Sequence, residues 1–400
     1  MPLTSLLRRY PQTHVNWRAS MAMLAALVVA GQSGLPLSIG YGWAQEIAPP
    51  APVPASRPKP EPNIHPQLPD SSGDADGVHT RAAAQLPVPS TTDRVRSASP
   101  SELTASRNRR AAAIGAVKNW GYQLAGLQIK AAAASPYDLL VVDATTGVGD
   151  GDAMTATDIT HLKRKPDGGR RLVVSYLSIG EAEDYRPDYF SAEYLEEDAP
   201  DWLMKENPKW KGNRIISFCE EGWQRTILGD DDGRNVYNSI EPSPLYRLIE
   251  LGLDGVYLDR VDVYSEVGKA CPDAERRMVA FVKRLAEHAR RRNPDFIVVL
   301  QNAEELLQHR DMIETIDAIA KEDLFYGEDH TEKTNDRDLV RDTLANLRLA
   351  RSAGRPVFFI DYVRSRAKIA DARKRGAAEG FIPYFGPRDL ARLWLPERDF

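Results

Sequence analysis

The chain has 400 residues, of which 42% are hydrophobic and 27% are charged, and its formal net charge is −5. The acidic balance argues against a dedicated nucleic-acid-binding protein, which normally carries an excess of basic residues. The two cysteines are too few for a disulfide-scaffolded miniprotein or for a multi-cysteine zinc site.

The first 44 residues are typical of a secretory signal peptide. Arg8 and Arg9 come before the apolar run Met21–Ala30, and Ala44 provides a small residue for cleavage. The run is shorter than the roughly 20 apolar residues that a membrane span needs. We therefore predict that residues 1–44 direct the protein to the periplasm or out of the cell. An uncleaved N-terminal membrane anchor is the alternative.

Residues 45–110 form a segment rich in proline, alanine and serine. Twelve of the 28 prolines lie between Glu46 and Pro100, where no helical or strand period is visible. Such a segment buries too little apolar surface to offset the loss of chain entropy on folding. We predict a disordered linker over 45–110 and a single folded domain over 111–400, a length that one α/β barrel can fill.

Short apolar runs alternate with helical stretches from Asn119 onward. Continuous apolar runs without in/out alternation are typical of parallel strands that are buried on both faces. Between them, Ala274–Arg292 and Arg337–Ala353 each carry one apolar stripe at helical spacing. The nine runs are Trp120–Leu124, Leu139–Val142, Leu172–Leu177, Ile215–Phe218, Gly255–Leu258, Phe296–Leu300, Ala318–Ala320, Val357–Ile360 and Phe381–Phe385.

Strand and helix repeat about eight times, which predicts an α/β fold of the (β/α)₈ TIM-barrel type. An open doubly wound sheet is the runner-up, although no glycine-rich phosphate loop follows the early strands. Nine runs are one too many for eight barrel positions, so one of them is an extra strand or a bulge. The sequence does not indicate which one.

Carboxylates follow most of the predicted strands, at the end where a parallel barrel opens. Glycoside hydrolysis needs two such groups, one to donate a proton and one to attack or to activate water. Arg186, Arg260 and Lys321 are the main basic residues among them. The polar residues are Asp143, Glu181, Glu183, Asp184, Asp259, Asp262, Gln301, Asn302, Glu304, Glu322, Asp323 and Asp361.

Aromatic residues are interleaved with these acids and could stack on sugar rings, although each could equally pack in the core. They are Trp120, Tyr122, Tyr176, Tyr185, Trp223, Tyr257, Tyr264, Tyr326 and Tyr362.

Other chemistries have little support. The four histidines of the predicted domain show no H-x-x-x-H spacing, and no G-x-S-x-G elbow occurs, so we predict neither a metal nor another cofactor. Cys219 and Cys271 follow consecutive strand-like runs, and in an exported protein they could form a disulfide or remain two free thiols.

Several blocks together resemble glycoside hydrolase family 114, the endo-α-1,4-polygalactosaminidase-like proteins. They cover most of residues 119–392. They are Trp120–Leu124 (WGYQL), Tyr176–Glu183 (YLSIGEAE) with Tyr185-Arg186, Gly252–Asp262 (GLDGVYLDRVD), Gln301–Leu306 (QNAEEL), Lys321–Gly327 (KEDLFYG) and Tyr384–Leu390 (YFGPRDL).

The resemblance implies a secreted TIM-barrel enzyme that cleaves α-1,4-linked galactosamine polymers with two acids. The family pattern places these acids on Asp259, as nucleophile, and on Glu322, as acid/base. This sequence departs from the family pattern at one point, because Ala303 follows Asn302 where the family often has glycine. We expect this methyl group to be tolerated unless the turn requires a positive φ.

The remaining candidates are predicted substrate contacts around the pair, with a structural role as the alternative for each. They are Trp120, Asp143, Tyr176, Glu181, Trp223, Arg260, Asp262, Asn302, Tyr326, Asp361 and Tyr362. An Arg260–Asp262 surface pair is one such alternative. Asp254, at the amino end of its strand, is interpreted as a turn residue.

The predicted partner is a polysaccharide rich in cationic amino sugars, because an acidic cleft attracts ammonium groups. We predict no nucleic-acid partner, and membrane contact only through an uncleaved N-terminal segment. The alternatives are a non-catalytic carbohydrate-binding barrel and a glycosidase of a neutral α-glycan.

Overall fold

The computed structural model describes residues 99–148, 152–183, 186, 199–208, 210–230, 233–234, 242–329 and 331–395. The predicted signal peptide and nearly all of the predicted linker lie outside these residues. The first described element is helix α1 (Pro100–Gly115), which begins ahead of the domain boundary predicted at Ala111. Ser99 caps it in a capping box with Glu102, so the sequence itself marks this helix start.

Eight parallel strands form the central sheet, in the order β1-β2-β3-β7-β8-β9-β10-β11. The strands are β1 (Trp120–Gln123), β2 (Leu139–Val142), β3 (Leu172–Ser178), β7 (Gly255–Asp259), β8 (Ile297–Gln301), β9 (Ala318–Glu322), β10 (Val357–Asp361) and β11 (Ile382–Phe385). The sheet curls into a nearly closed barrel, and at the seam the Trp120 indole N–H of β1 donates to the Ile382 carbonyl of β11 at 3.1 Å. This confirms the predicted (β/α)₈ TIM-type fold.

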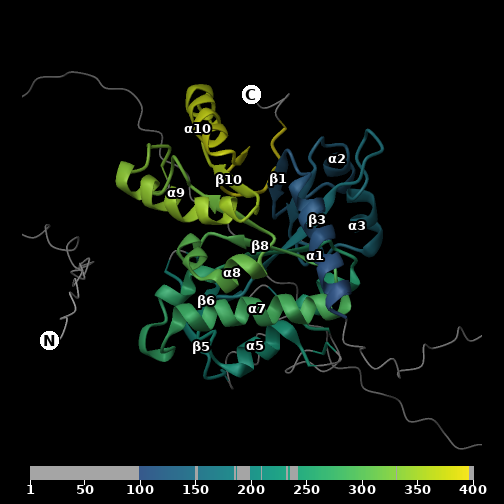
Figure 1. The fold of residues 1–400 in the computed structure, drawn as a ribbon, viewed down its shortest axis with the longest axis vertical. Helices are drawn as coiled ribbons and strands as arrows, with labels where there is room; N and C mark the ends of the chain where they lie inside the picture. Colours follow the sequence, from purple (N-terminus) through teal and green to yellow (C-terminus); the bar gives the residue numbers. More distant parts are fainter. Residues whose placement is uncertain are drawn as a thin grey trace, which may run out of the picture. The chain divides into compact units, whose positions relative to one another are not determined.

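Helices lie outside the strands, as Figure 1 shows for α7 to α10. They are α2 (Ile129–Ala133), α3 (Ala156–Leu162), α5 (Glu221–Leu228), α6 (Pro244–Glu250), α7 (Ala274–Arg292), α8 (Arg310–Thr315), α9 (Arg337–Ser352) and α10 (Arg366–Glu379), with 3₁₀ turns at Val261–Ser265, Gly268–Ala270 and Glu304–Gln308. None of the helices within the described ranges is long and apolar enough to span a membrane.

The two helices predicted from their apolar stripes are confirmed as α7 and α9. Met278, Phe281 and Leu285 of α7 are fully buried, and each such side chain contributes roughly 1.5–3 kcal/mol. Asp273 occupies the N-cap position of α7, but its backbone is left-handed (φ 54°) and its side chain makes no capping hydrogen bond.

The surplus strand-like run is Ile215–Phe218. It belongs to a separate three-stranded antiparallel sheet, β4-β6-β5, made of β4 (Glu181–Glu183), β5 (Leu203–Glu206) and β6 (Asn213–Ile216). β4 begins shortly after β3 ends, so this sheet grows from the carboxyl end of the barrel. Ile215 and Ile216 are buried like barrel residues, which explains why their sequence resembles that of a barrel strand.

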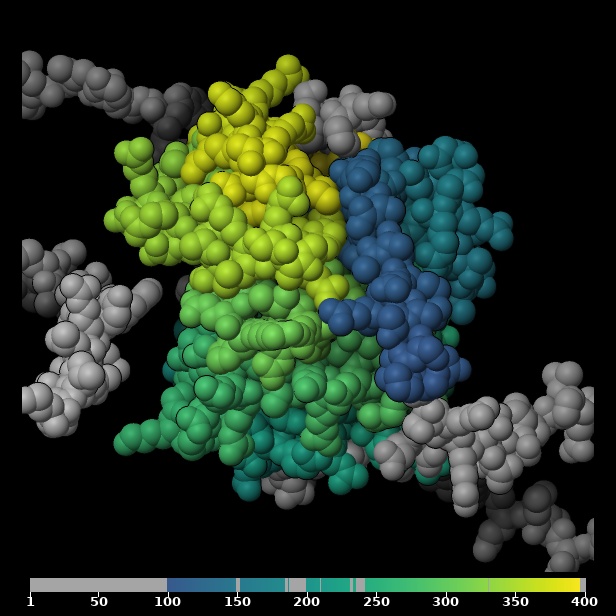
Figure 2. Space-filling model, viewed as in Figure 1, coloured from purple at the N-terminus to yellow at the C-terminus, as the bar shows by residue number. Residues whose placement is uncertain are grey.

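The acids at the amino end of the barrel are paired with basic side chains. Asp317, ahead of β9, bonds Arg110 of α1 at 3.1 Å and Arg290 of α7 at 2.7 Å. Asp254, ahead of β7, pairs with Lys163 and accepts from the Val173 amide, in keeping with the structural role predicted for it. Figure 2 shows α1, in blue, on the surface next to the green of α7. These ion pairs stabilise the end of the barrel at which the strands begin.

Candidate active site

Three neighbouring strands end in the same unusual backbone turn. The residues directly after β7, β8 and β9 are Arg260, Asn302 and Asp323, with φ of 56°, 54° and 49°. Left-handed backbone costs a residue other than glycine about 1–2 kcal/mol, and such strain collects at functional sites. The turns mark the carboxyl ends of these strands as the mouth of the barrel, where Asp259, Gln301 and Glu322 are the last strand residues.

Asp259 and Glu322 point into the same mouth. Tyr257 donates a hydrogen bond from its phenol to the Gln301 side chain and packs 5.1 Å from Tyr122, so it faces the barrel interior. Asp259 follows Tyr257 by two residues and therefore faces the same way. Glu322 follows Ala320 by two residues, and Ala320 pairs with Gln301. Asp259 and Glu322 are both partly exposed, so solvent reaches them.

The two carboxyls interact electrostatically. Burial raises the pKa of Asp259 to about 7, and the charges of Glu322 and Asp262 add to the rise. Burial also raises the pKa of Glu322, while hydrogen bonds from Tyr362 and Asn302 oppose the rise. Among the described residues no ion pair to Asp259 or Glu322 is found. The pair is therefore suited to hold one proton near neutral pH, as acid–base catalysis requires.

Glu322 is held from two sides. Tyr362, directly after β10, donates its phenol to Oε1, and the Asn302 amide lies 3.5 Å from Oε2. Asn302 also accepts from the Glu322 backbone amide at 3.0 Å. Arg388 lies 4.4 Å above the Tyr362 ring and bonds both oxygens of Asp323, at 2.8 and 2.7 Å. Asn302 and Tyr362 thus contact a proposed catalytic acid directly.

Asp361 is fully buried beside this group. Its Oδ1 accepts from the Phe325 amide at 3.1 Å, and its Oδ2 has no partner within the described part of the chain. Burial raises its pKa to about 7. It supports the loop that follows Glu322, and its full burial argues against the substrate contact predicted for it.

A second network lies behind Asp259. Glu181 of β4 is buried and receives the side-chain amides of Asn207 (2.6 Å) and Asn213 (3.0 Å), and it pairs with Arg260 at 2.8 Å. Arg260 also pairs with Asp262 at 3.2 Å, and the Asp262 side chain is 45% exposed. The surface pair considered as an alternative is therefore present, and Asp262 remains reachable at the rim.

The backbone behind Asp259 is packed so closely that one position requires glycine. A Cβ at Gly180 would overlap the carbonyl oxygen of Arg260. The start of the β4 sheet therefore touches the backbone of the residue that follows Asp259.

Asp143 and Tyr176 belong to a third network, centred on the buried Arg186. Arg186 bonds both oxygens of Asp143 (3.1 and 2.6 Å), ion-pairs with Glu183, and lies 5.3 Å from the Tyr176 ring centre. Burial alone would raise the pKa of Asp143, but Arg186 and two threonine hydroxyls bring it below its usual value. Asp143 is thus the ion-pair partner of a buried arginine, while Tyr176 keeps 8% of its surface exposed.

Three predicted substrate contacts do not face the mouth. Trp120 is fully buried among barrel aromatics, and Trp223 of α5 is fully buried with its indole on the Ile179 carbonyl. Tyr326 turns outward, because its phenol donates to Asp371 of α10 at 2.8 Å. Neither tryptophan exposes any surface to a sugar, and the Tyr326 phenol is bonded to α10. The structure therefore gives no support for a substrate contact at these three residues.

Sequence reasoning did not select Arg388, Asn207 or Asn213. Arg388 lies in the YFGPRDL block, which was its one signal. Asn207 and Asn213 are ordinary loop residues by sequence, and only the fold brings their amides to Glu181. No group of three histidine, cysteine, aspartate or glutamate side chains suited to a metal ion is found in the described ranges.

Ala303 tests the expectation about the Asn-Ala turn. Its φ is 54° and its ψ is 36°, so the turn does require the left-handed region. We predict that Ala303→Gly removes a strain of about 1 kcal/mol, partly offset by the greater freedom of glycine in the unfolded chain. Thermal unfolding should show a Tm equal to or up to roughly 3 °C above that of the wild type. A clear fall in Tm would mean that this backbone is not strained.

Comparisons with known proteins find related sequences and a related fold. The sequence model of glycoside hydrolase family GH114 matches residues 101–397. An uncharacterized protein of Deinococcus radiodurans is 36% identical over 288 residues, 71% of this chain and 84% of its own. One from Methanocaldococcus jannaschii is 29% identical over 295 residues, 69% of this chain and 79% of its own.

Among solved structures, the glycoside hydrolase domain of PelA from Pseudomonas aeruginosa superposes with a TM-score of 0.52. It is 18% identical, and the match covers 69% of this chain and 97% of that domain. At 18% identity this similarity shows a shared fold and nothing further.

Proposed function

The chain belongs to glycoside hydrolase family GH114 and is a TIM-barrel glycosidase, and from this we propose that it is an exported endo-acting enzyme that cleaves α-1,4-linked galactosamine-containing polysaccharide. Asp259 and Glu322 are its two catalytic carboxylates in this proposal.

One observation carries the choice of residues. Asp259 and Glu322 are partly exposed carboxyls at the ends of β7 and β9, and the charge of Glu322 helps to raise the pKa of Asp259 to about 7. The described acids at the other end of the barrel, Asp254 and Asp317, are ion-paired instead. Within the described ranges the mouth pair forms no ion pair, and it can supply both an acid and a carboxylate.

The charge around the pair supports a cationic substrate. Burial and the charge of Glu266 raise the pKa of Asp262, and burial and the charges of Glu304 and Asp262 raise the pKa of Glu305. The basic residues among them, Arg260 and Lys321, are held by Glu181 and Glu304. An acidic rim attracts a polymer with free ammonium groups, and salt weakens the attraction because the screening length falls below about 10 Å above 0.1 M.

Two features support export. The sequence of residues 1–44 has the composition of a signal peptide, and Cys219 and Cys271 are disulfide-bonded in the structure. Disulfides persist in oxidising compartments such as the periplasm and the cell exterior.

The test uses the mature chain with partly deacetylated α-1,4-galactosamine polymer and, in parallel, a neutral α-1,4-glucan. We expect new reducing ends only from the first, at a rate that falls as salt is raised to about 0.5 M. Cleavage of the glucan without a salt effect would instead support the neutral-glycan enzyme. Binding of polymer without product would support the non-catalytic barrel.

A further inference from the structure

One exposed aromatic side chain lies in the small antiparallel sheet that follows β3 in the chain. Among the described residues, four large apolar side chains are more than a third exposed: Leu103 (57%), Trp210 (58%), Leu339 (39%) and Leu349 (40%). Leu103 is on α1, and both Leu339 and Leu349 are on α9. Trp210 alone is aromatic, and it lies in the loop of the β5–β6 hairpin, in the sheet that grows from the end of β3.

Backbone hydrogen bonds join Trp210 to Asn207 and Asn213. The Trp210 amide donates to the Asn207 carbonyl at 3.2 Å, and the Trp210 carbonyl accepts from the Asn213 amide at 3.1 Å. Asn207 and Asn213 close the loop by a further bond of 2.7 Å, and Gly212 donates to Glu206 at 2.8 Å. The backbone of Trp210 is thus hydrogen-bonded to both asparagines, and its indole remains 58% exposed.

The same loop is tied to the catalytic strand. The side chains of Asn207 and Asn213 each bond one oxygen of the buried Glu181, and Glu181 pairs with Arg260, the residue after Asp259. Trp210 is three residues from each asparagine. A short series of contacts therefore connects the backbone of Trp210 to Arg260, the residue directly after Asp259.

We propose that Trp210 is a stacking platform for a sugar ring of the bound polysaccharide, outside the two rings that flank the cleaved bond. This rests on the proposed function. A flat indole packs against the apolar face of a pyranose, whatever the substituents on its edge. A long chain seated across the barrel mouth continues past the cleaved bond, and the hairpin rises at this mouth. The occupant is the polysaccharide chain itself rather than a second protein.

The experiment compares Trp210→Ala with Trp210→Phe, and with Leu339→Ala as a matched removal of an exposed apolar side chain on α9. Each is assayed on long polymer and on the shortest oligomer that the wild type cleaves. We expect Trp210→Ala to lower kcat/KM on polymer roughly five- to tenfold, mostly through KM, because one ring contact is lost. The oligomer should be cleaved as by the wild type, Trp210→Phe should recover most of the loss, and Leu339→Ala should change nothing.

A binding arm separates this proposal from the proposed function. Polymer affinity is measured by calorimetry with Glu322→Gln and with Glu322→Gln/Trp210→Ala, both checked for folding by circular dichroism. If the wild type cleaves polymer and Trp210→Ala equals it in rate and affinity, the platform is wrong and the glycosidase assignment stands. If the wild type binds polymer without cleaving it and Trp210→Ala weakens this binding, the platform stands and the proposed function is wrong. Equal losses on oligomer and polymer would also overturn the platform.

Discussion

Asp259→Asn and Glu322→Gln are each expected to lower kcat by a factor on the order of 10³ or more. Both amides keep the size of the side chain but can neither exchange a proton nor attack the sugar. Because solvent reaches both residues, the variants should fold, and circular dichroism checks this. The measurement is the initial rate of reducing-end release from the polymer at saturating concentration.

The matched control is Glu328→Gln, which removes an exposed carboxylate from the loop that follows β9. It changes the net charge by the same amount as Glu322→Gln, so it reports the effect of charge alone on polymer binding. We expect a rate within about twofold of the wild type. If Glu328→Gln were as inactive as Glu322→Gln, or if both catalytic variants kept the wild-type rate, the pair would be the wrong one.

The same two variants assign the roles of the acids. Catalysis needs one protonated and one ionised carboxyl, so kcat/KM should fall above pH 7, where the group with a pKa of about 7 loses its proton. The family resemblance makes Glu322 the acid/base, whereas the donors on Glu322 and the raised pKa of Asp259 favour the reverse order in the free enzyme. An aryl glycoside with a good leaving group distinguishes the two orders. Its leaving group needs no protonation, so it should restore cleavage in the variant that lacks the general acid.

The fold was predictable because eight buried parallel strands produce continuous apolar runs in the sequence, and helical stretches separate these runs. Leu139–Val142 and the helix Ala274–Arg292 were predicted with the bounds that the structure has. The extra strand among the nine runs was predicted, but there is a physical reason why Ile215–Phe218 could not be identified as that strand. Two buried isoleucines in a short antiparallel sheet look like a barrel strand, and composition does not record which neighbour a strand pairs with.

The candidate pair was predictable for a related reason. In a parallel barrel all strands end at one mouth, so Asp259 and Glu322 could be brought together from strand ends alone, with the resemblance selecting them from several acids. The aromatic residues were not predictable in this way. Trp120 and Tyr122 lie two residues apart on β1 and both are buried inside the barrel, and depth below the mouth depends on the register between strands.

The left-handed turns were also beyond the sequence. Arg260, Asn302 and Asp323 are not residues that demand a positive φ, and Ala303 is disfavoured there. Contacts with distant parts of the chain fix these turns. The Asp323 amide donates to the Ile360 carbonyl, and the Asp323 side chain bonds Arg388, which is 65 residues away in the chain. Local propensity does not contain such long-range information.

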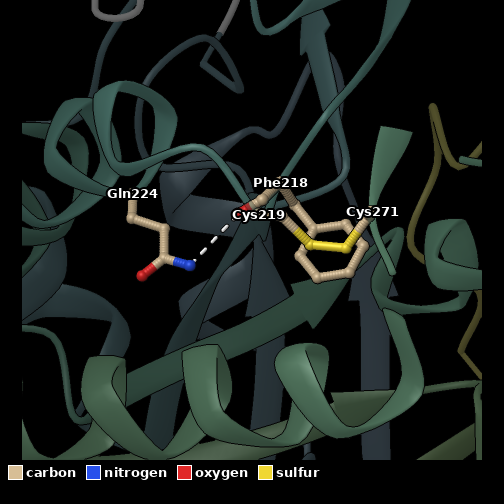
Figure 3. The surroundings of a disulfide bond; sticks show 4 residues. All are labelled: Phe218, Cys219, Gln224 and Cys271. Atoms are coloured by element: carbon tan, nitrogen blue, oxygen red, sulfur yellow. Dashed lines mark hydrogen bonds between the residues drawn. A yellow bond between two sulfur atoms is a disulfide. The ribbon is translucent and has the colours of Figure 1, made fainter. Parts of the chain in front are cut away.

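Removing the disulfide is expected to lower the free energy of unfolding by about 4 kcal/mol and Tm by roughly 10 °C. Cys219 and Cys271 have their Cα atoms 5.8 Å apart and close a loop of 52 residues that includes β7. Figure 3 shows the bond beside the buried Phe218 ring, with Gln224 bonded to the Phe218 carbonyl at 3.1 Å. Differential scanning calorimetry of Cys219→Ala/Cys271→Ala against the wild type measures the loss.

We expect the loss in stability rather than in catalytic rate, because the bond joins the segment after β6 to the segment after β7 and neither cysteine is a proposed catalytic residue. Reductant supplies the control: it should bring the wild type close to the double variant and leave the variant unchanged. Wild-type protein made without its leader in a reducing cytoplasm should likewise be less stable, and oxidation should recover it. Two titratable thiols in native protein from the periplasm, or equal Tm values in all forms, would contradict both the bond and its use as support for export.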